Sequence, residues 1–113
     1  MQPILTNNAN YRPGKVGLPK AVTVSLFQDH IQITGKGGKA ILNAPLSQLT
    51  NVGKGMGFIA FKVDGQYYGL EFISIKAKLF GLLGFLLSPG LRIAKQWKGE
   101  LESLGVAVGK QHW

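Results

Sequence analysis

The sequence predicts a mainly β fold with one C-terminal α-helix: an antiparallel barrel or sandwich of roughly six to seven strands, capped by a helix at about 89–104. Three observations predict it. Apolar and polar residues alternate with a period of two through much of 21–72. Glycine, proline and aspartate separate these runs at short intervals. From residue 88 the apolar period changes to three and four, which is typical of a helix.

The first part of this β region contains a hairpin and two further strands. The runs AVTVSLF and HIQITG alternate on either side of a polar break at Gln28-Asp29, which predicts a hairpin. The glycine-rich sequence GKGGK at 35–39 predicts a turn, followed by a short strand at about 40–43. After Pro45, LSQLTNV predicts another strand, which ends at GKGMG, residues 53–57.

The second hairpin is the clearest unit of the sequence. In GFIAFKV-DG-QYYGLEFI, the Asp-Gly pair at 64–65 favours a two-residue turn, because glycine adopts a positive φ at little cost. Pairing outward from this turn sets Phe61 opposite Tyr68, both on the core side. The same register sets Lys62 opposite Tyr67 on the outer face, which Phe58 shares.

The C-terminal region predicts one amphipathic helix. Ser88 suits the N-cap and Pro89 the first helical position. Spacings of three and four join the apolar residues Leu91, Ala94, Trp97, Leu101 and Leu104 into one stripe. Gly105 suits a left-handed C-cap. We therefore expect Trp97 and Leu101, with Phe61 and Tyr68, in the structural core.

A length of 113 residues predicts a single domain. Residues 1–19 hold three prolines and an Asn-rich stretch, which predicts an irregular arm. The domain is expected over 20–106, with an apolar insert at 79–87 and a tail at 107–113. The absence of cysteine and of a signal-peptide pattern favours a cytoplasmic location, with a peripheral membrane location as the alternative.

The order of these elements resembles the pleckstrin-homology-like (PH-like, bacterial PH/GRAM-type) superfamily. The matching stretches are VTVSLFQDHIQI, APLSQLTNV, FIAFKVDGQYYGLEF and IAKQWKGELESLGV. In that family a helix tryptophan packs into the mouth of the barrel, and Trp97 is the matching residue. The resemblance implies a binding module for lipids, peptides or proteins. Phosphoinositide-binding members carry basic residues at their first loop, whereas this loop, Gln28-Asp29, is short and acidic.

The charge balance favours an anionic partner. Thirteen Lys and Arg against five Asp and Glu give a formal net charge of +8, which attracts nucleic acid, acidic protein or anionic lipid. In an up-and-down meander, the turns 35–39 and 53–57 and the exit at Ser74 share one rim. A basic rim is then expected from Lys36, Lys39, Lys54, Lys76 and Lys78. The alternative is that these are separate, solvated lysines.

The sequence LFGLLGFLL, residues 79–87, has no polar side chain. As a helix, this segment would extend only about 14 Å. A helix that crosses a bilayer needs roughly 20 apolar residues, so this segment is too short to span a membrane. We expect it to pack into the core as a strand or short helix. The alternatives are a partner or self-association surface and shallow membrane insertion. The residues proposed for docking or an interface are Leu79, Phe80, Leu82, Leu83, Phe85 and Leu86.

Few residues are suited to catalysis, so we expect no enzyme, no catalytic residue, no cofactor and no metal site. The carboxylates fall at turns, a strand exterior and the helix surface, with no convergent pair. Asp29 and His30 are neighbours but are expected to point to opposite faces. With two histidines and no cysteine there is no ligand spacing for a metal. Neither glycine-rich turn fits a phosphate-binding motif.

Three functions are consistent with these features. The first is a non-enzymatic PH-like module that docks on an anionic membrane surface, through its lipid headgroups, or on a protein partner, using the basic rim. The second is a nucleic-acid-binding β-barrel that uses Phe58, Tyr67 and Lys62. The third is a homo-oligomerising structural domain that uses the apolar segment 79–87.

Overall fold

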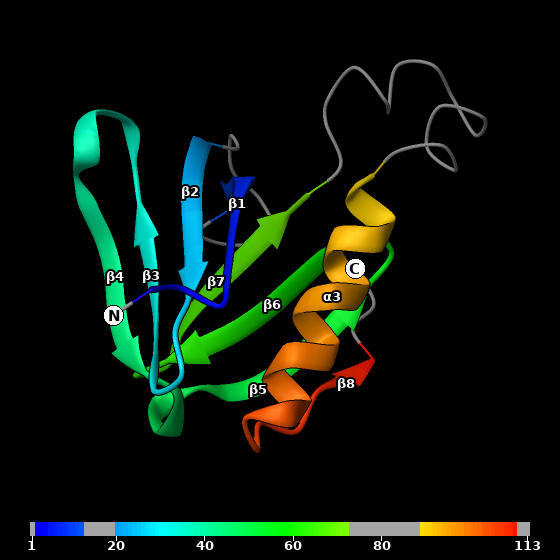
Figure 1. The fold of residues 1–113 in the computed structure, drawn as a ribbon. Coiled ribbons are helices and arrows are strands. Elements are labelled where there is room, and N and C mark those ends of the chain that lie inside the picture. The colour runs from blue at the N-terminus through cyan, green and yellow to red at the C-terminus, as the bar shows by residue number, and fades with distance from the viewer. Residues whose placement is uncertain (1, 13–19, 73–88, 111–113) are drawn as a thin grey trace.

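The computed structural model describes residues 2–12, 20–72 and 89–110. In this part of the chain the fold is mainly β, with one α-helix near the C-terminus (Figure 1). The strands are β1 (Leu5–Arg12), β2 (Lys20–Leu26), β3 (His30–Thr34), β4 (Ala40–Pro45), β5 (Thr50–Gly55), β6 (Phe58–Val63), β7 (Gln66–Glu71) and β8 (Gly109–Lys110). The helices are α3 (Gly90–Ser103) and the short 3-10 helices η1 (Lys36–Gly38) and η2 (Leu46–Gln48).

The strands form one eight-stranded sheet in the order β4-β3-β2-β1-β7-β6-β5-β8. Neighbouring strands are antiparallel except β5 and β8, which are parallel. The expectation of a six- to seven-stranded antiparallel barrel is therefore wrong in two respects: the sheet has eight strands, and the β5–β8 pair is parallel. β8 has only two residues, which is too short to display any hydrophobic period.

The other uncounted strand is β1, and the expectation of an irregular arm at 1–19 is wrong for Leu5–Arg12. β1 is central: it pairs with β2 from Leu5↔Leu26 to Tyr11↔Lys20, and with β7 from Asn10 to Arg12. The prolines flank this strand and do not interrupt it. Its period of two was hidden because Asn7, a polar residue, occupies an inward position between Leu5 and Ala9.

Both predicted hairpins are present, β2–β3 and β6–β7. The second has the predicted register, with Phe61 opposite Tyr68 and Lys62 opposite Tyr67. Asp64 and Gly65 have φ angles of 52° and 78°, the paired positive values of a type I′ turn. The strand expected from Leu46 begins later, because Leu49 donates a backbone hydrogen bond to the Leu46 carbonyl and closes η2.

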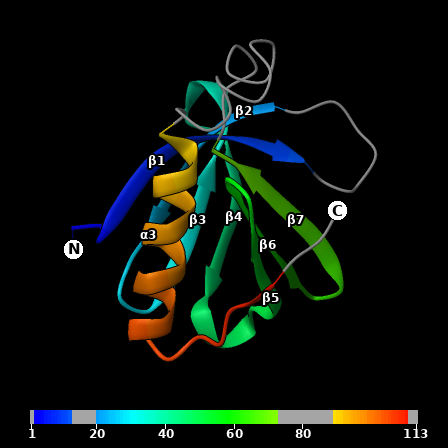
Figure 2. The same cartoon turned by 90° about the vertical axis from the view of Figure 1, so that its right-hand side faces the viewer.

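The sheet bends at β1 into two layers (Figure 1 and Figure 2). Strands β1–β4 form one layer, and β5–β7 cross them at a steep angle. Helix α3 packs on β5 and β6 and lies across the open side between the layers. Its inward residues are Ala94, Trp97 and Leu101, each at most 1% exposed. Phe61 and Tyr68, from β6 and β7, are buried in the same core.

The boundaries of α3 agree closely with the predicted helix at about 89–104. At its C-terminus, Gly105 has a φ of 89°, and its N–H donates to the Glu102 carbonyl. The N–H of Val106 donates to the Leu101 carbonyl. These two bonds make a Schellman motif, which satisfies carbonyls that the last helical turn would leave unpaired. The predicted N-cap, Ser88, lies outside the described residues.

A side-chain hydrogen bond joins the helix to the central strand. The indole Nε1 of Trp97 donates to Asn7 Oδ1 at 2.8 Å, and the indole ring stacks on Phe72 at a centroid distance of 5.9 Å. Trp97 is 0% exposed. A buried indole needs an acceptor for its N–H, which explains why an asparagine is tolerated at an inward position of β1.

A double-mutant cycle will measure this contact. Asn7→Ala leaves the Trp97 N–H without its acceptor, so we expect the free energy of unfolding to fall by about 1–3 kcal/mol. In a Trp97→Phe background the indole N–H is absent, and Asn7→Ala should cost much less. Urea denaturation of the four proteins gives the coupling energy. An equal cost of Asn7→Ala in both backgrounds would show that the hydrogen bond does not stabilise the fold.

Candidate functional site

The structure separates the lysines of the predicted basic rim. Lys36 and Lys39 lie at the turn between β3 and β4, whereas Lys54 lies near the end of β5 on the other side of the molecule, beside α3 (Figure 1). The expectation that these turns share one rim is wrong, because β4 and β5 do not pair and belong to different layers. Lys76, Lys78 and the apolar segment 79–87 lie outside the described residues.

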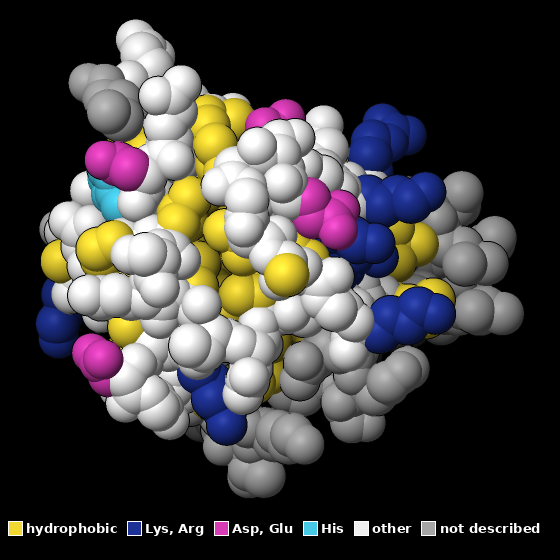
Figure 3. All heavy atoms as spheres, turned by 90° about the horizontal axis from the view of Figure 1, so that it is seen from below, with side chains coloured by type: hydrophobic (Ala, Val, Ile, Leu, Met, Phe, Trp, Pro, Cys, Tyr) yellow, Lys and Arg dark blue, Asp and Glu magenta, His cyan; other side chains and the backbone are white. Residues whose placement is uncertain are grey.

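Lys54 lies instead in a basic pocket with two cations of α3. This basic pocket has a volume of about 420 Å³ and is lined by Lys54, Met56, Leu91, Arg92 and Lys95. Its polar side chains are all cationic, and its two apolar side chains lie among them. Figure 3 shows Lys and Arg side chains gathered along one side of the molecule, with hydrophobic side chains between them. The pocket therefore combines positive charge with accessible apolar surface.

Two chain segments build the basic pocket. The turn after β5, with Gly57 at a φ of 79°, leaves Met56 61% exposed. The first turns of α3 supply Leu91, Arg92 and Lys95, whose spacings of three and four place them on neighbouring parts of one helix face.

The positive charge of this pocket is reinforced by the C-terminal strand. In the parallel pairing of β5 and β8, Lys54 lies beside Lys110. Within the described residues no ion pair neutralises Lys54, Arg92, Lys95 or Lys110. Like charges this close repel one another and attract a shared anion. Arg92 and Lys95 were not among the predicted site residues; their spacing beside Leu91 was the available signal.

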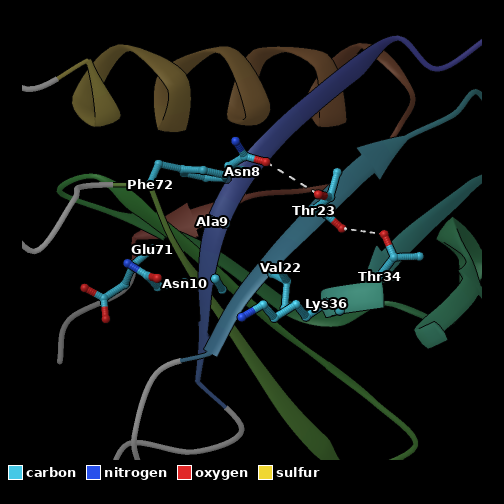
Figure 4. A pocket seen from close by; sticks show the side chains of 11 residues that line it. Asn8, Ala9, Asn10, Val22, Thr23, Thr34, Lys36, Glu71 and Phe72 are labelled. Carbon is cyan, nitrogen blue, oxygen red and sulfur yellow. Dashed lines mark hydrogen bonds between the residues drawn. The ribbon is translucent and has the colours of Figure 1, made fainter. Parts of the chain in front are cut away.

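A second pocket, of about 490 Å³, lies on the outer face of β1–β3 (Figure 4). We call it the polar pocket. Its side chains include two amides, two hydroxyls, one ammonium and one carboxylate: Asn8, Asn10, Thr23, Thr34, Lys36 and Glu71. Thr23 Oγ1 donates to Asn8 Oδ1 at 3.4 Å, and Thr34 Oγ1 donates to the Thr23 carbonyl at 3.3 Å. This pocket was not predicted, because Leu5–Arg12 was expected to belong to an irregular arm and not to a strand.

Glu71 also belongs to a charged cluster on the outer face of β1 and β7. Its carboxylate forms an ion pair with Arg12, and only 13% of the Glu71 side chain is exposed. Burial and, to a lesser extent, the negative charge of Glu71 raise the pKa of the nearby Tyr67 hydroxyl to about 12, against the opposing effect of Arg12. Tyr67 is therefore a neutral hydroxyl at ordinary pH.

Asp29 and His30 do converge, contrary to expectation. His30 Nδ1 lies 2.6 Å from Asp29 Oδ1, because Asp29 lies in the turn before β3 and not in the strand. This hydrogen bond is the main cause that lowers the pKa of Asp29. The His30 ring stacks on Phe27 at a centroid distance of 4.3 Å. In the described part of the chain no nucleophilic side chain is hydrogen-bonded to this pair.

The aromatic surface expected for nucleic-acid binding is not exposed. Phe58 is only 7% exposed, although it lies on the same face of β6 as Lys62, and Tyr67 is half-buried. A stacking platform needs exposed aromatic rings. This face therefore lacks the two accessible rings that the second hypothesis required.

Neither the models of known protein families nor the curated proteins with which the sequence was compared match this chain. Of the helices in the described ranges, none has the length and apolar character needed to cross a membrane. Across residues 2–12, 20–72 and 89–110, no group of three or more His, Cys, Asp or Glu side chains could hold a metal ion.

The Tyr67 environment makes a prediction for tyrosine titration. One tyrosine should ionise at a pKa of about 12 and be absent from the titration of Tyr67→Phe. Glu71→Gln should lower this pKa, whereas Asp64→Asn, in the exposed β6–β7 turn, should not change it. The raised pKa also makes the stability of the fold depend on pH. The folded state holds the Tyr67 proton more tightly than the unfolded state, whose pKa is the ordinary 10.0. This contribution to the free energy of unfolding is complete below pH 10.0 and is lost as the pH rises through about 12. Ultraviolet absorbance measures the ionisation, and a Tyr67 pKa near 10.0 would contradict this account.

Proposed function

We propose that this protein is a non-enzymatic binding module that docks on an anionic membrane surface through the basic pocket. The observation that carries the proposal is the arrangement of Lys54, Arg92 and Lys95 around exposed Met56 and half-buried Leu91. Each Lys or Arg near an anionic bilayer contributes about 1 kcal/mol of attraction. Headgroup phosphates would neutralise the cations.

The apolar side chains distinguish a lipid surface from other anions. Exposed apolar residues among cations are typical of surfaces that lie at the boundary between headgroups and acyl chains. Insertion of Met56 would bury side-chain surface at a gain of about 25 cal/mol per Å². An acidic protein partner is the alternative that the same charges favour. A nucleic acid is less favoured, because Phe58 is buried.

We also propose that the domain is PH-like. This proposal is supported by the bend of the sheet at β1, by the two crossing layers and by the C-terminal helix whose Trp97 closes the space between them. The acidic Gln28-Asp29 turn, which was expected to be the first loop of the domain, joins β2 and β3, because β1 precedes them. The proposed lipid-docking residues lie elsewhere, at the β5–β6 turn and on α3. The corresponding cellular role is that of a cytoplasmic protein that associates peripherally with membranes. The likeness of the fold by itself assigns no ligand.

Vesicle co-sedimentation tests the docking proposal. Vesicles that contain phosphatidylserine should bind the protein, and vesicles of phosphatidylcholine alone should not. The variant Lys54→Glu/Lys95→Glu should bind at least about tenfold more weakly, because two contributions of about 1 kcal/mol are lost and tenfold corresponds to 1.4 kcal/mol. Added salt should weaken the binding of the unmodified protein.

The matched control is Lys36→Glu/Lys39→Glu, which lowers the net charge by the same amount at the distant β3–β4 turn. It should retain most of the binding. Equal losses in the two variants would show that attraction depends on overall charge and not on the basic pocket. Absence of binding to anionic vesicles at low salt would exclude the proposed function and leave an acidic protein as the partner to test.

A further inference from the structure

The polar pocket is a hollow formed by small residues of the bent sheet. Its inner surface includes the small side chain of Ala21 and the backbone of Ala9 and Val22, whose side chains point into the core. Ala21 pairs with Asn10 and lies on the outer face, where a larger side chain would occupy this space. Taller polar side chains surround these small residues, and Lys36 reaches from η1 across β2 (Figure 4). The volume of about 490 Å³ lies within the usual range for small-molecule sites, about 300–1,000 Å³.

The amides at this pocket retain hydrogen-bonding capacity. Asn8 Oδ1 accepts from the Thr23 hydroxyl, which leaves the Asn8 amino group available as a donor. Within the described residues, the Asn10 amide makes no side-chain hydrogen bond. An amide that presents both a donor and an acceptor matches a hydroxyl group, which is itself both donor and acceptor.

The Lys36 ammonium is the one charge lining the pocket that no ion pair neutralises within the described residues. Glu71 is paired with Arg12 and mostly buried, and the Lys36 ammonium is exposed. An exposed, hydrated ammonium by itself attracts an anion only weakly, whereas the amides and hydroxyls that form most of the polar lining match uncharged hydroxyl groups. The lining is also too polar for an apolar ligand, because a bound hydrocarbon would leave these groups without water or partners.

We propose that the polar pocket binds a neutral polyhydroxylated ligand, a saccharide or a cyclic polyol. Asn8 and Asn10 hydrogen-bond its hydroxyl groups, and Lys36 donates to a hydroxyl oxygen. The Ala21 side chain and the backbone of Ala9 and Val22 contact its C–H surface. This activity is separate from membrane docking, because the polar pocket and the basic pocket share no lining residue.

Nuclear magnetic resonance titration of the ¹⁵N-labelled protein tests the proposal. The probes are glucose, galactose, N-acetylglucosamine and myo-inositol, with inorganic phosphate and acetate as anionic probes. We expect at least one neutral probe to cause saturable shifts in the Asn8 and Asn10 side-chain amides and in the Thr23 and Thr34 backbone amides. Asn8→Ala/Asn10→Ala should weaken this binding about tenfold or more, because two hydrogen-bonding groups are lost.

The control variant is Thr6→Ala/Ser25→Ala. It removes the neighbouring hydrogen-bonded pair on the same face of β1 and β2, Thr6 Oγ1 to Ser25 Oγ at 3.2 Å, outside the polar pocket, and should leave saccharide binding unchanged. The spectra of both variants report whether each is folded. Absence of saturable shifts with all four neutral probes would overturn the proposal. Shifts with phosphate or acetate alone, or undiminished binding in a folded Asn8→Ala/Asn10→Ala variant, would also overturn it.

Discussion

The fold depends on the burial of Trp97 between two layers of one bent sheet. β1 carries the bend, since it pairs with β2 of one layer and with β7 of the other. The opening that the bend creates is closed by α3, whose indole stacks on Phe72 and donates to Asn7. A large aromatic side chain at 0% exposure excludes water from this space, and the hydrogen bond fixes the position of the helix along β1.

Both pockets follow from this arrangement. With Trp97 inward, the first turns of α3 are held beside the β5–β6 turn, where Arg92 and Lys95 meet Lys54. The alternation of β1 separates structural from binding roles within a few residues: Asn7 faces the helix, whereas Asn8 and Asn10 line the polar pocket. A strand with a period of two presents both sets of side chains without conflict. The same asparagine-rich stretch thus contributes a hydrogen bond to the core and two side chains to the proposed saccharide site.

Local sequence patterns predicted most of the strands and the helix, but they did not predict which elements pair across long distances in the chain. The β6–β7 register followed from an Asp-Gly turn, and the bounds of α3 followed from an apolar stripe and Gly105. β1 was not predicted because Asn7, a polar residue, occupies an inward position. The alternation of β1 can be recognised only when Trp97 is known to donate a hydrogen bond to Asn7. The basic pocket required knowledge that β5 lies beside α3 and far from β4. Of its residues only Lys54 was selected, and no local pattern links it to Arg92 and Lys95.

The bond between Asn7 and Trp97 spans 90 positions of the chain, which has a consequence for how the protein reaches its native state. β1 is synthesised well before its partner β7 and the closing helix. Contacts between residues so distant in sequence form slowly, because loop-closure entropy is lost before the contact is gained. During synthesis the hairpins can form in order, but the two layers cannot close over a dry interior until α3 has left the ribosome.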